Sequence, residues 1–83
     1  MSREILLTLI GKPGCHLCDD AEVAVQSVLE DFSAVSFDKA NILEDPDLFE
    51  KYAEQIPVLL INGQIHNYWR IDTERLREAL AKL

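Results

Sequence analysis

The first forty residues alternate between strand-like and helix-like patterns, and this alternation limits the folds open to the chain. Residues 4–10 form a nearly continuous apolar run of strand length, and residues 34–40 alternate apolar and polar side chains. Between them, from Cys15 to about Phe32, apolar side chains recur at helical spacing on one stripe: Leu17, Ala21, Val25, Val28, Leu29 and Phe32. A strand, a crossover helix and a strand form a βαβ unit with parallel strands. The pattern therefore predicts an α/β fold whose first strand is central and covered on both faces.

A second helix is predicted to begin at Asp45. An aspartate at this position can accept a hydrogen bond from the first helical turn, and Pro46 then stands where a helix tolerates proline. This helix must end before Pro57, because the residue before a proline disfavours the helical conformation. The segment between the predicted second and third strands is therefore helical in its first part only.

The last third of the chain predicts a β-hairpin and a final helix. Residues 58–61 have the pattern of a third strand. Asn62-Gly63 is typical of a two-residue hairpin, so residues 64–69 should return as an antiparallel strand. Asp72 can cap a final helix over residues 73–82. The predicted order is therefore β-α-β-α-β-β-α around a four-stranded mixed sheet.

The composition describes one globular domain, residues 1–83, with an acidic surface. Apolar residues make up 48% and charged residues 28% of the chain, as in ordinary globular proteins. Fifteen acidic residues against eight basic ones give a net charge of −7, which repels phosphate backbones and anionic lipid. We therefore expect neither nucleic acid nor a membrane as partner. The first apolar run is too short for a secretory signal, so we expect a cytoplasmic protein. We also expect the protein to be a monomer.

The two cysteines, Cys15 and Cys18, stand together at the predicted strand-to-helix turn, in GKPGCHLCDD. A structural disulfide is a poor interpretation, because cytosolic disulfides are usually transient and so short a loop removes little entropy from the unfolded chain. Zinc needs four ligands, and His16 and His66 are the remaining soft or borderline candidates. The pattern favours a redox dithiol. A carrier of zinc or an iron–sulfur cluster and a redox-inert adaptor stay open as alternatives.

The position of the pair on the helix favours unequal roles for the two thiols. Residues three apart lie on one helix face with Cα atoms roughly 5–5.5 Å apart, within the range of a disulfide. Cys15 stands at the helix N-terminus, where a thiol pKa of about 8.5 can fall to about 3.5–7.5. Lys12 and His16 lie close enough in sequence to add to this effect. We therefore predict that Cys15 is the exposed nucleophile and Cys18 the resolving thiol.

Two motifs resemble the glutaredoxins and related small dithiol electron carriers of the thioredoxin superfamily: KPGCHLC after the first strand, and QIPVLLING before the hairpin. The resemblance implies a thioredoxin/glutaredoxin-like fold over nearly the whole chain and thiol–disulfide oxidoreductase activity. It implies a cis Pro57 against the cysteines and a backbone at Ile56 that pairs with the substrate chain. The implied partners are a disulfide-containing protein or a glutathione mixed disulfide, with a thioredoxin reductase or the glutathione system as electron donor.

The chain departs from the family pattern where glutathione would bind. Glutaredoxins usually carry a Gly-Gly pair after the hairpin, followed by an acidic residue, whereas this chain has HNYWRID. Asp72 can supply the acidic group, but Trp69 and Arg70 are bulky and no glycine is present. We therefore expect no resident cofactor and poor use of glutathione. The predicted substrate-binding residues are Lys12, Ile56, Pro57 and Asp72.

Overall fold

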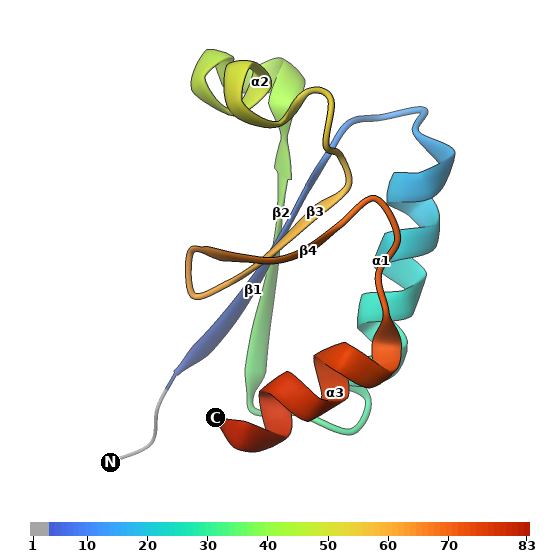
Figure 1. The fold of residues 1–83 in the computed structure, drawn as a ribbon, viewed down its shortest axis with the longest axis vertical. Coiled ribbons are helices and arrows are strands. Elements are labelled where there is room, and N and C mark those ends of the chain that lie inside the picture. Colours follow the sequence, from blue (N-terminus) through green and yellow to red (C-terminus); the bar gives the residue numbers. More distant parts are fainter. Residues whose placement is uncertain (1–3) are drawn as a thin grey trace.

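The computed structural model describes residues 4–83, which form a four-stranded mixed sheet with the order β2-β1-β3-β4 (Figure 1). Strand β1 (Ile5–Gly11) pairs in parallel with β2 (Val35–Asn41) and antiparallel with β3 (Val58–Ile61). Strand β4 (Gln64–Tyr68) completes the sheet antiparallel to β3. The predicted α/β class, mixed sheet and central first strand are therefore confirmed. Residues 1–3 of the predicted domain lie outside the described residues.

Within residues 4–83, three α-helices cover the sheet: α1 (His16–Leu29), α2 (Pro46–Tyr52) and α3 (Thr73–Lys82). Because strand side chains alternate between faces, the sheet has two separate cores. Helices α1 and α3 enclose the larger core, built from Leu7, Leu9, Ala21, Val25, Val28, Leu59, Leu76 and Leu80. Helix α2 and a short 3-10 helix, η1 (Ile42–Glu44), pack over a smaller core on the other face, built from Ile10, Ile42 and Val58. In the described part of the chain, no helix has both the length and the apolar character needed to span a bilayer.

Both predicted aspartate caps are present. The Asp45 carboxylate accepts hydrogen bonds from the backbone N–H groups of Asp47, at 3.0 Å, and Leu48, at 3.4 Å. The Asp72 carboxylate accepts the N–H of Arg75 at 3.1 Å. Each cap satisfies backbone donors that have no partner inside the helix, so each helix begins where its cap stands.

The hairpin turn between β3 and β4 also confirms its prediction. Asn62 and Gly63 both have positive φ, 51° and 84°, as a two-residue turn of this type requires. Asn62 also ties the turn to β1: its N–H donates to the Leu6 carbonyl at 2.9 Å, and its side-chain oxygen accepts the Leu6 N–H at 2.9 Å. The asparagine therefore sets both the turn and its position on the central strand.

Helix α1 is shorter than predicted, because it ends at Leu29 and not near Phe32. The N–H groups of Asp31 and Phe32 donate to the carbonyls of Val28 and Leu29, at 3.0 and 3.1 Å, so the chain tightens to three-residue hydrogen bonds. Phe32 still packs against the larger core. The apolar pattern therefore extended past the end of the helix because Phe32 contacts the core from the turn that follows α1.

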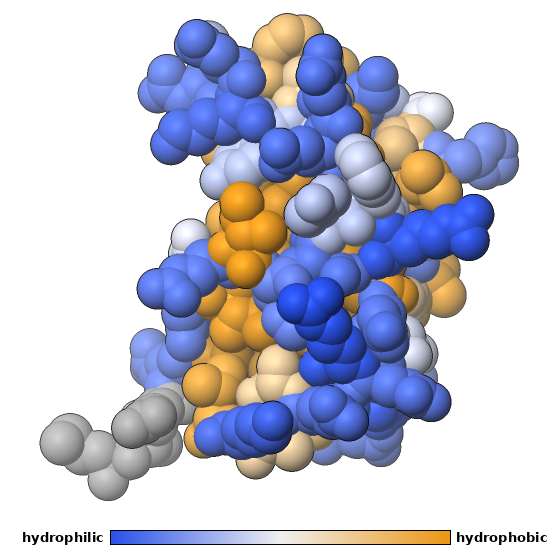
Figure 2. Space-filling view, in the orientation of Figure 1, coloured by the Kyte–Doolittle hydropathy of each residue, from blue (hydrophilic) through white to orange (hydrophobic). Residues whose placement is uncertain are grey.

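The predicted cover on both faces of β1 is wrong for the start of the strand. Leu6 is 41% exposed, and Ile65 on β4 is 52% exposed. Helix α2 has only seven residues and packs over the far end of β1, around Ile10, and no other helix among residues 4–83 covers this face at the near end. Figure 2 shows apolar side chains exposed in the middle of the molecule, where the strands cross in Figure 1.

Candidate redox site

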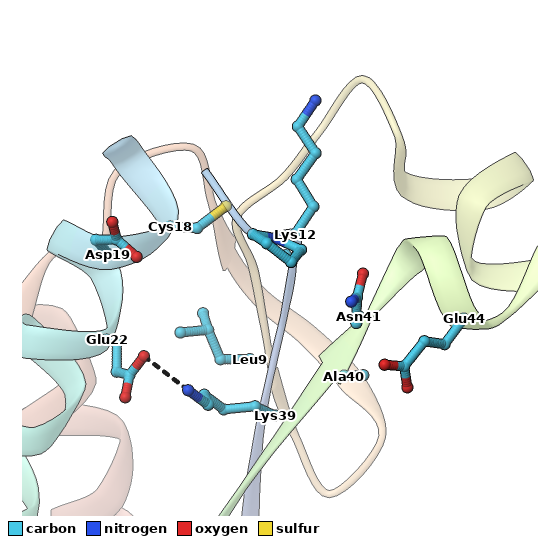
Figure 3. A pocket seen from close by; sticks show the side chains of 11 residues that line it. Leu9, Lys12, Cys18, Asp19, Glu22, Lys39, Ala40, Asn41 and Glu44 are labelled. Carbon is cyan, nitrogen blue, oxygen red and sulfur yellow. Dashed lines mark hydrogen bonds and ion pairs between the residues drawn. The ribbon is translucent and has the colours of Figure 1, made fainter. Parts of the chain in front are cut away.

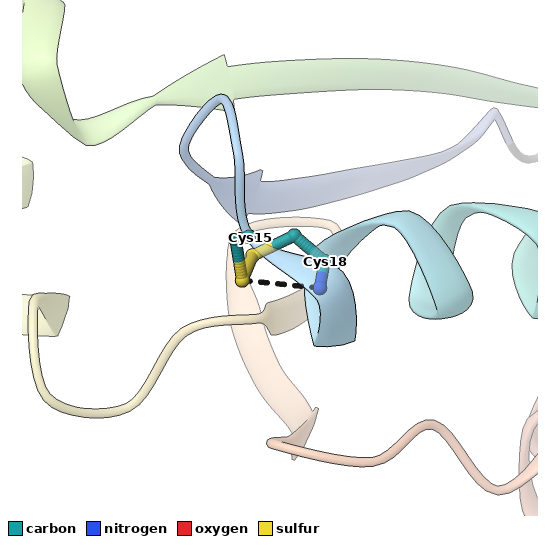
Figure 4. Close-up of a disulfide and its surroundings, with 2 residues drawn as sticks. All are labelled: Cys15 and Cys18. Atoms are coloured by element: carbon teal, nitrogen blue, oxygen red, sulfur yellow. Dashed lines mark hydrogen bonds between the residues drawn. A yellow bond between two sulfur atoms is a disulfide. The ribbon is translucent and has the colours of Figure 1, made fainter.

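Cys15 is the N-cap residue of α1, and its backbone is extended, with φ −96° and ψ 112°. Its Sγ accepts a hydrogen bond from the backbone N–H of Cys18 at 3.2 Å (Figure 4). The two residues are joined by a disulfide, and their Cα atoms lie 5.2 Å apart, within the spacing that the sequence predicted. One turn of helix therefore carries both the sulfur atoms and an N–H donor directed at the first of them.

The two cysteines differ in burial. Cys18 is 7% exposed, whereas Cys15 is half-buried. The buried stripe of α1 begins at Cys18. The periodicity placed Leu17 on that stripe, and this prediction is wrong, because Leu17 is 42% exposed. The thiol that reaches the surface is thus the one at the helix terminus.

Pro57 enters the same end of the sheet from β3. Ile10 of β1 pairs with Val58, so Pro57 lies across from the end of β1, where the turn to the cysteines begins. The Ile56–Pro57 peptide bond is cis, as the resemblance implied, and Pro57 is fully buried. Figures 1 and 4 both show the segment that enters β3 passing beside the turn that carries Cys15. The topology therefore brings the CxxC turn and the proline loop together.

The backbone around Ile56 is partly engaged inside the protein. The Ile56 N–H donates to the Tyr52 carbonyl at 3.1 Å. A substrate chain that pairs with Ile56 must therefore use its carbonyl or displace this bond.

Trp69 lies beside the proline loop and holds it at two points. Its backbone N–H donates to the Pro57 carbonyl at 2.8 Å, and its indole Nε1 donates to the Glu54 carbonyl at 3.2 Å. The prediction that the last strand runs to residue 69 is wrong, because β4 ends at Tyr68 and Trp69 has a φ of 66°. Glycine adopts this left-handed conformation freely and a bulky residue rarely does. The tryptophan therefore has a backbone shape suited to glycine.

The chain after Trp69 lies against the start of α1. A cavity of about 320 Å³ is lined by Leu17 and the first turns of α1 on one side and by Trp69, Arg70 and Ile71 on the other. The stretch that replaces the family's glycine pair thus adjoins the helix of the cysteines. Sequence reasoning named this stretch but missed the exposed side chain of Leu17.

Lys12 and Asp72 are less closely joined to the thiols. Lys12 is exposed, and its ammonium group extends away from Cys18 (Figure 3). Asp72 caps α3, and its N–H donates to the Asn67 side chain at 3.2 Å. Within residues 4–83, no hydrogen bond or ion pair connects Lys12 or Asp72 to either cysteine.

A second cavity, of about 450 Å³, opens beside Cys18 between α1 and β2. An ion pair crosses it, with Lys39 Nζ 3.0 Å from a carboxylate oxygen of Glu22 (Figure 3). Sequence reasoning did not single out either residue. The available signal was the spacing of Glu22, four residues after Cys18 and therefore on the same side of the helix.

The candidate metal ligands do not form a cluster. Across the described residues, no group of three or more His, Cys, Asp or Glu side chains lies close enough together to hold a metal ion. His16 is exposed at the start of α1, and His66 lies on β4.

His66 is expected to make folding stability sensitive to mild acid. Its Nε2 is buried without a hydrogen-bond partner among the described residues, and burial, then the charge of Arg75, lower the pKa of His66 below 6.5, against an opposing effect of Asp72. Because the unfolded chain then binds the proton more tightly than the folded one, stability is lost as the pH falls through 6.5 and below. Urea unfolding between pH 7.5 and 5.5 should show a steeper loss for the wild type than for His66→Gln. Parallel losses would contradict this expectation.

Comparisons with known proteins agree with the geometry. The family described as "Glutaredoxin-like domain (DUF836)" matches residues 6–81. An uncharacterized protein of Mycobacterium tuberculosis is 33% identical over 81 residues, covering 89% of this chain and 80% of its own. The X-ray structure of target protein XcR50 from X. campestris is 32% identical with a TM-score of 0.75, covering 93% of this chain and 97% of its own.

The fold extends to more distant proteins. Oxidized mitochondrial thioredoxin 3 of Saccharomyces cerevisiae matches with a TM-score of 0.70 at 18% identity, covering 96% of this chain and 79% of its own. That likeness concerns the fold alone. With residues 6–81 matched and a CxxC turn set against a cis-proline loop, the chain belongs to the glutaredoxin-like family of the thioredoxin superfamily.

Proposed function

We propose that this protein is a thiol–disulfide oxidoreductase in which Cys15 attacks the substrate and Cys18 resolves the product. The observation that carries the proposal is the placement of Cys15 as the N-cap of α1, within bonding reach of a buried Cys18. Family membership supports a redox role for this pair.

The N-terminus of α1 supports Cys15 as the nucleophile. The Cys18 N–H that donates to Cys15 Sγ at 3.2 Å stabilises a negative charge on that sulfur, as does the positive end of the helix dipole. Cys18, 7% exposed, has little access to a substrate in solution. An incoming disulfide therefore meets Cys15 first.

The exchange proceeds in two balanced steps. The Cys15 thiolate attacks one sulfur of the substrate disulfide, forms a mixed disulfide, and releases the other substrate sulfur as a thiolate that takes up a proton. The Cys18 thiol then loses its proton and attacks Cys15 Sγ. The Cys15–Cys18 bond forms, the bond to the substrate breaks, and the second substrate thiolate leaves. Two electrons have passed from the protein to the substrate, and two electrons from a thiol reductant, either one dithiol or two monothiols, restore the pair.

We assign substrate contacts to Lys12, Ile56, Pro57 and Asp72. Pro57 adjoins the cysteine turn, and the Ile56 carbonyl can pair with an extended substrate chain. The proposed partners are a disulfide-containing protein or a glutathione mixed disulfide, with a thioredoxin reductase or the glutathione system as donor. We further propose that the protein acts as a cytoplasmic monomer.

Brief alkylation of the reduced protein at pH 6 tests the proposal. Cys15 should be modified at least about tenfold faster than Cys18, because Cys15 is only half-buried and stands at a helix N-terminus, whereas Cys18 is buried. Peptide mass spectrometry measures the two rates, and the pH dependence of the Cys15 rate gives its titration. A Cys15 thiol that titrates near about 8.5 would favour a redox-inert adaptor. Visible absorbance and metal analysis of the purified protein test the carrier alternative.

A further inference from the structure

Gly11, the last residue of β1, is buried directly against the resolving cysteine. A Cβ atom on Gly11 would lie 2.8 Å from Cys18 Sγ and 3.1 Å from Cys18 Cβ. Non-bonded heavy atoms have their best separation at roughly 3.5–4.0 Å, so the sulfur occupies space that any side chain at this position would need.

The other two glycines serve a different purpose. Gly14 and Gly63 have φ of 76° and 84°, and a Cβ on either would meet nothing within 4 Å. Their backbone shape explains glycine there. Gly11 has a strand conformation that any residue can adopt, so the reason for glycine at this position is the approach of Cys18.

The contact matters more in one redox state than in the other. In the disulfide, the bond to Cys15 fixes the Cys18 sulfur, and α1 fixes its backbone. In the dithiol, the sulfur is free to turn about the Cα–Cβ bond to another staggered position. A side chain at position 11 therefore penalises the disulfide more than the dithiol.

We propose that Gly11 is a positioning residue for the resolving thiol: its missing side chain leaves the space that holds Cys18 Sγ within reach of Cys15. The inference rests on the proposed function, because it concerns the step in which Cys18 attacks Cys15 Sγ and displaces the substrate thiolate. A side chain at position 11 turns the attacking sulfur away from that path.

The redox equilibrium of Gly11→Ala with dithiothreitol tests the proposal. In this exchange the protein disulfide takes two electrons and two protons from dithiothreitol, which closes to its cyclic disulfide. We expect the equilibrium constant for forming the Cys15–Cys18 bond to fall about tenfold, equivalent to about 30 mV for a two-electron couple. Gly63→Ala is the control, because its methyl group enters open space away from the sulfurs, so its cost is the backbone strain of a φ of 84° and not a contact with Cys18. A Gly11→Ala equilibrium within about twofold of the wild type, or an equal change in Gly63→Ala, would overturn the proposal.

A stability cycle separates the contact from any redox assay. Gly11→Ala should cost more folding stability in the wild type than in the Cys18→Ala background, where the sulfur is gone. If Gly11→Ala alone fails to fold, the double variant should regain the fold. An equal cost in both backgrounds, or no recovery in the double variant, would refute the role of Gly11. Neither measurement uses a substrate, so absent turnover counts against the proposed function and not against this contact.

Discussion

Cys18→Ser is expected to keep a substrate thiol on Cys15 as a mixed disulfide, whereas Cys15→Ser is expected to capture none. Without Cys18, release depends on an external thiol in place of a sulfur held one helical turn away, with Cα atoms 5.2 Å apart. An effective molarity of only about 1 M for Cys18 already makes release by millimolar external thiol about a thousandfold slower, and well-oriented intramolecular groups can exceed 1 M by several orders of magnitude. Cys15→Ser leaves only a buried thiol, so its turnover should fall to background.

Non-reducing electrophoresis and mass spectrometry of protein incubated with a small neutral disulfide measure both outcomes. The double variant, with serine at both positions, reports adducts that form without either thiol. Equal recovery of adducts from the two single variants would contradict the assignment of nucleophile and resolving thiol. It would show that the difference in burial between Cys15 and Cys18 does not control access.

The second large effect concerns glutathione, which the wild type is expected to use poorly despite a reactive Cys15. A tripeptide lying along the proline loop needs close backbone approach, and the indole of Trp69 holds the Glu54 carbonyl of that loop. Loss of two hydrogen bonds to the glutathione backbone costs about 1–3 kcal/mol, or about five- to 150-fold in affinity. Turnover coupled to glutathione and its reductase should therefore be slow, while a thioredoxin reductase remains a candidate donor.

Replacing both Tyr68 and Trp69 with glycine should raise glutathione turnover by about five- to 150-fold, the factor by which the wild type is expected to lose affinity. The backbone of Trp69 already has a φ of 66°, so glycine fits there without rearrangement. Trp69→Ala is the matched comparison, because it removes the indole but keeps a Cβ in the left-handed conformation. The alkylation rate of Cys15 should stay unchanged in all three proteins. Wild-type turnover equal to that of ordinary dithiol glutaredoxins would refute this prediction.

The features that the sequence predicted well depend on a few neighbouring residues. Asp45 and Asp72 cap their helices, and Asn62-Gly63 forms its turn, because each needs only the local backbone. The CxxC spacing is equally local, which is why the Cα separation could be anticipated. Local chemistry of this kind is visible in the order of the residues.

The features that were missed depend on contacts between distant segments. The exposure of Leu17 depends on where α1 meets the sheet, and the backbone shape of Trp69 depends on hydrogen bonds to the carbonyls of Glu54 and Pro57, earlier in the chain. A glycine after a strand is an ordinary break in a sequence pattern, and the contact of Gly11 with Cys18 exists only once α1 folds back along β1. Periodicity shows which side chains are apolar, but it does not show which of these side chains another helix or strand buries.

The strand order gives the parts of the site different resistance to local unfolding. Strands β1 and β3 have a neighbour on each side, whereas β2 and β4 are edges. Transient unfolding in native proteins starts where few contacts must be lost, and this favours edges over centres. The cysteine turn extends from β1 and the proline loop leads into β3, but Trp69 follows the edge strand β4. Fraying of β4 would therefore loosen the Trp69 side of the proposed substrate surface, while the cysteine turn and the proline loop, which adjoin the central strands, stay in place.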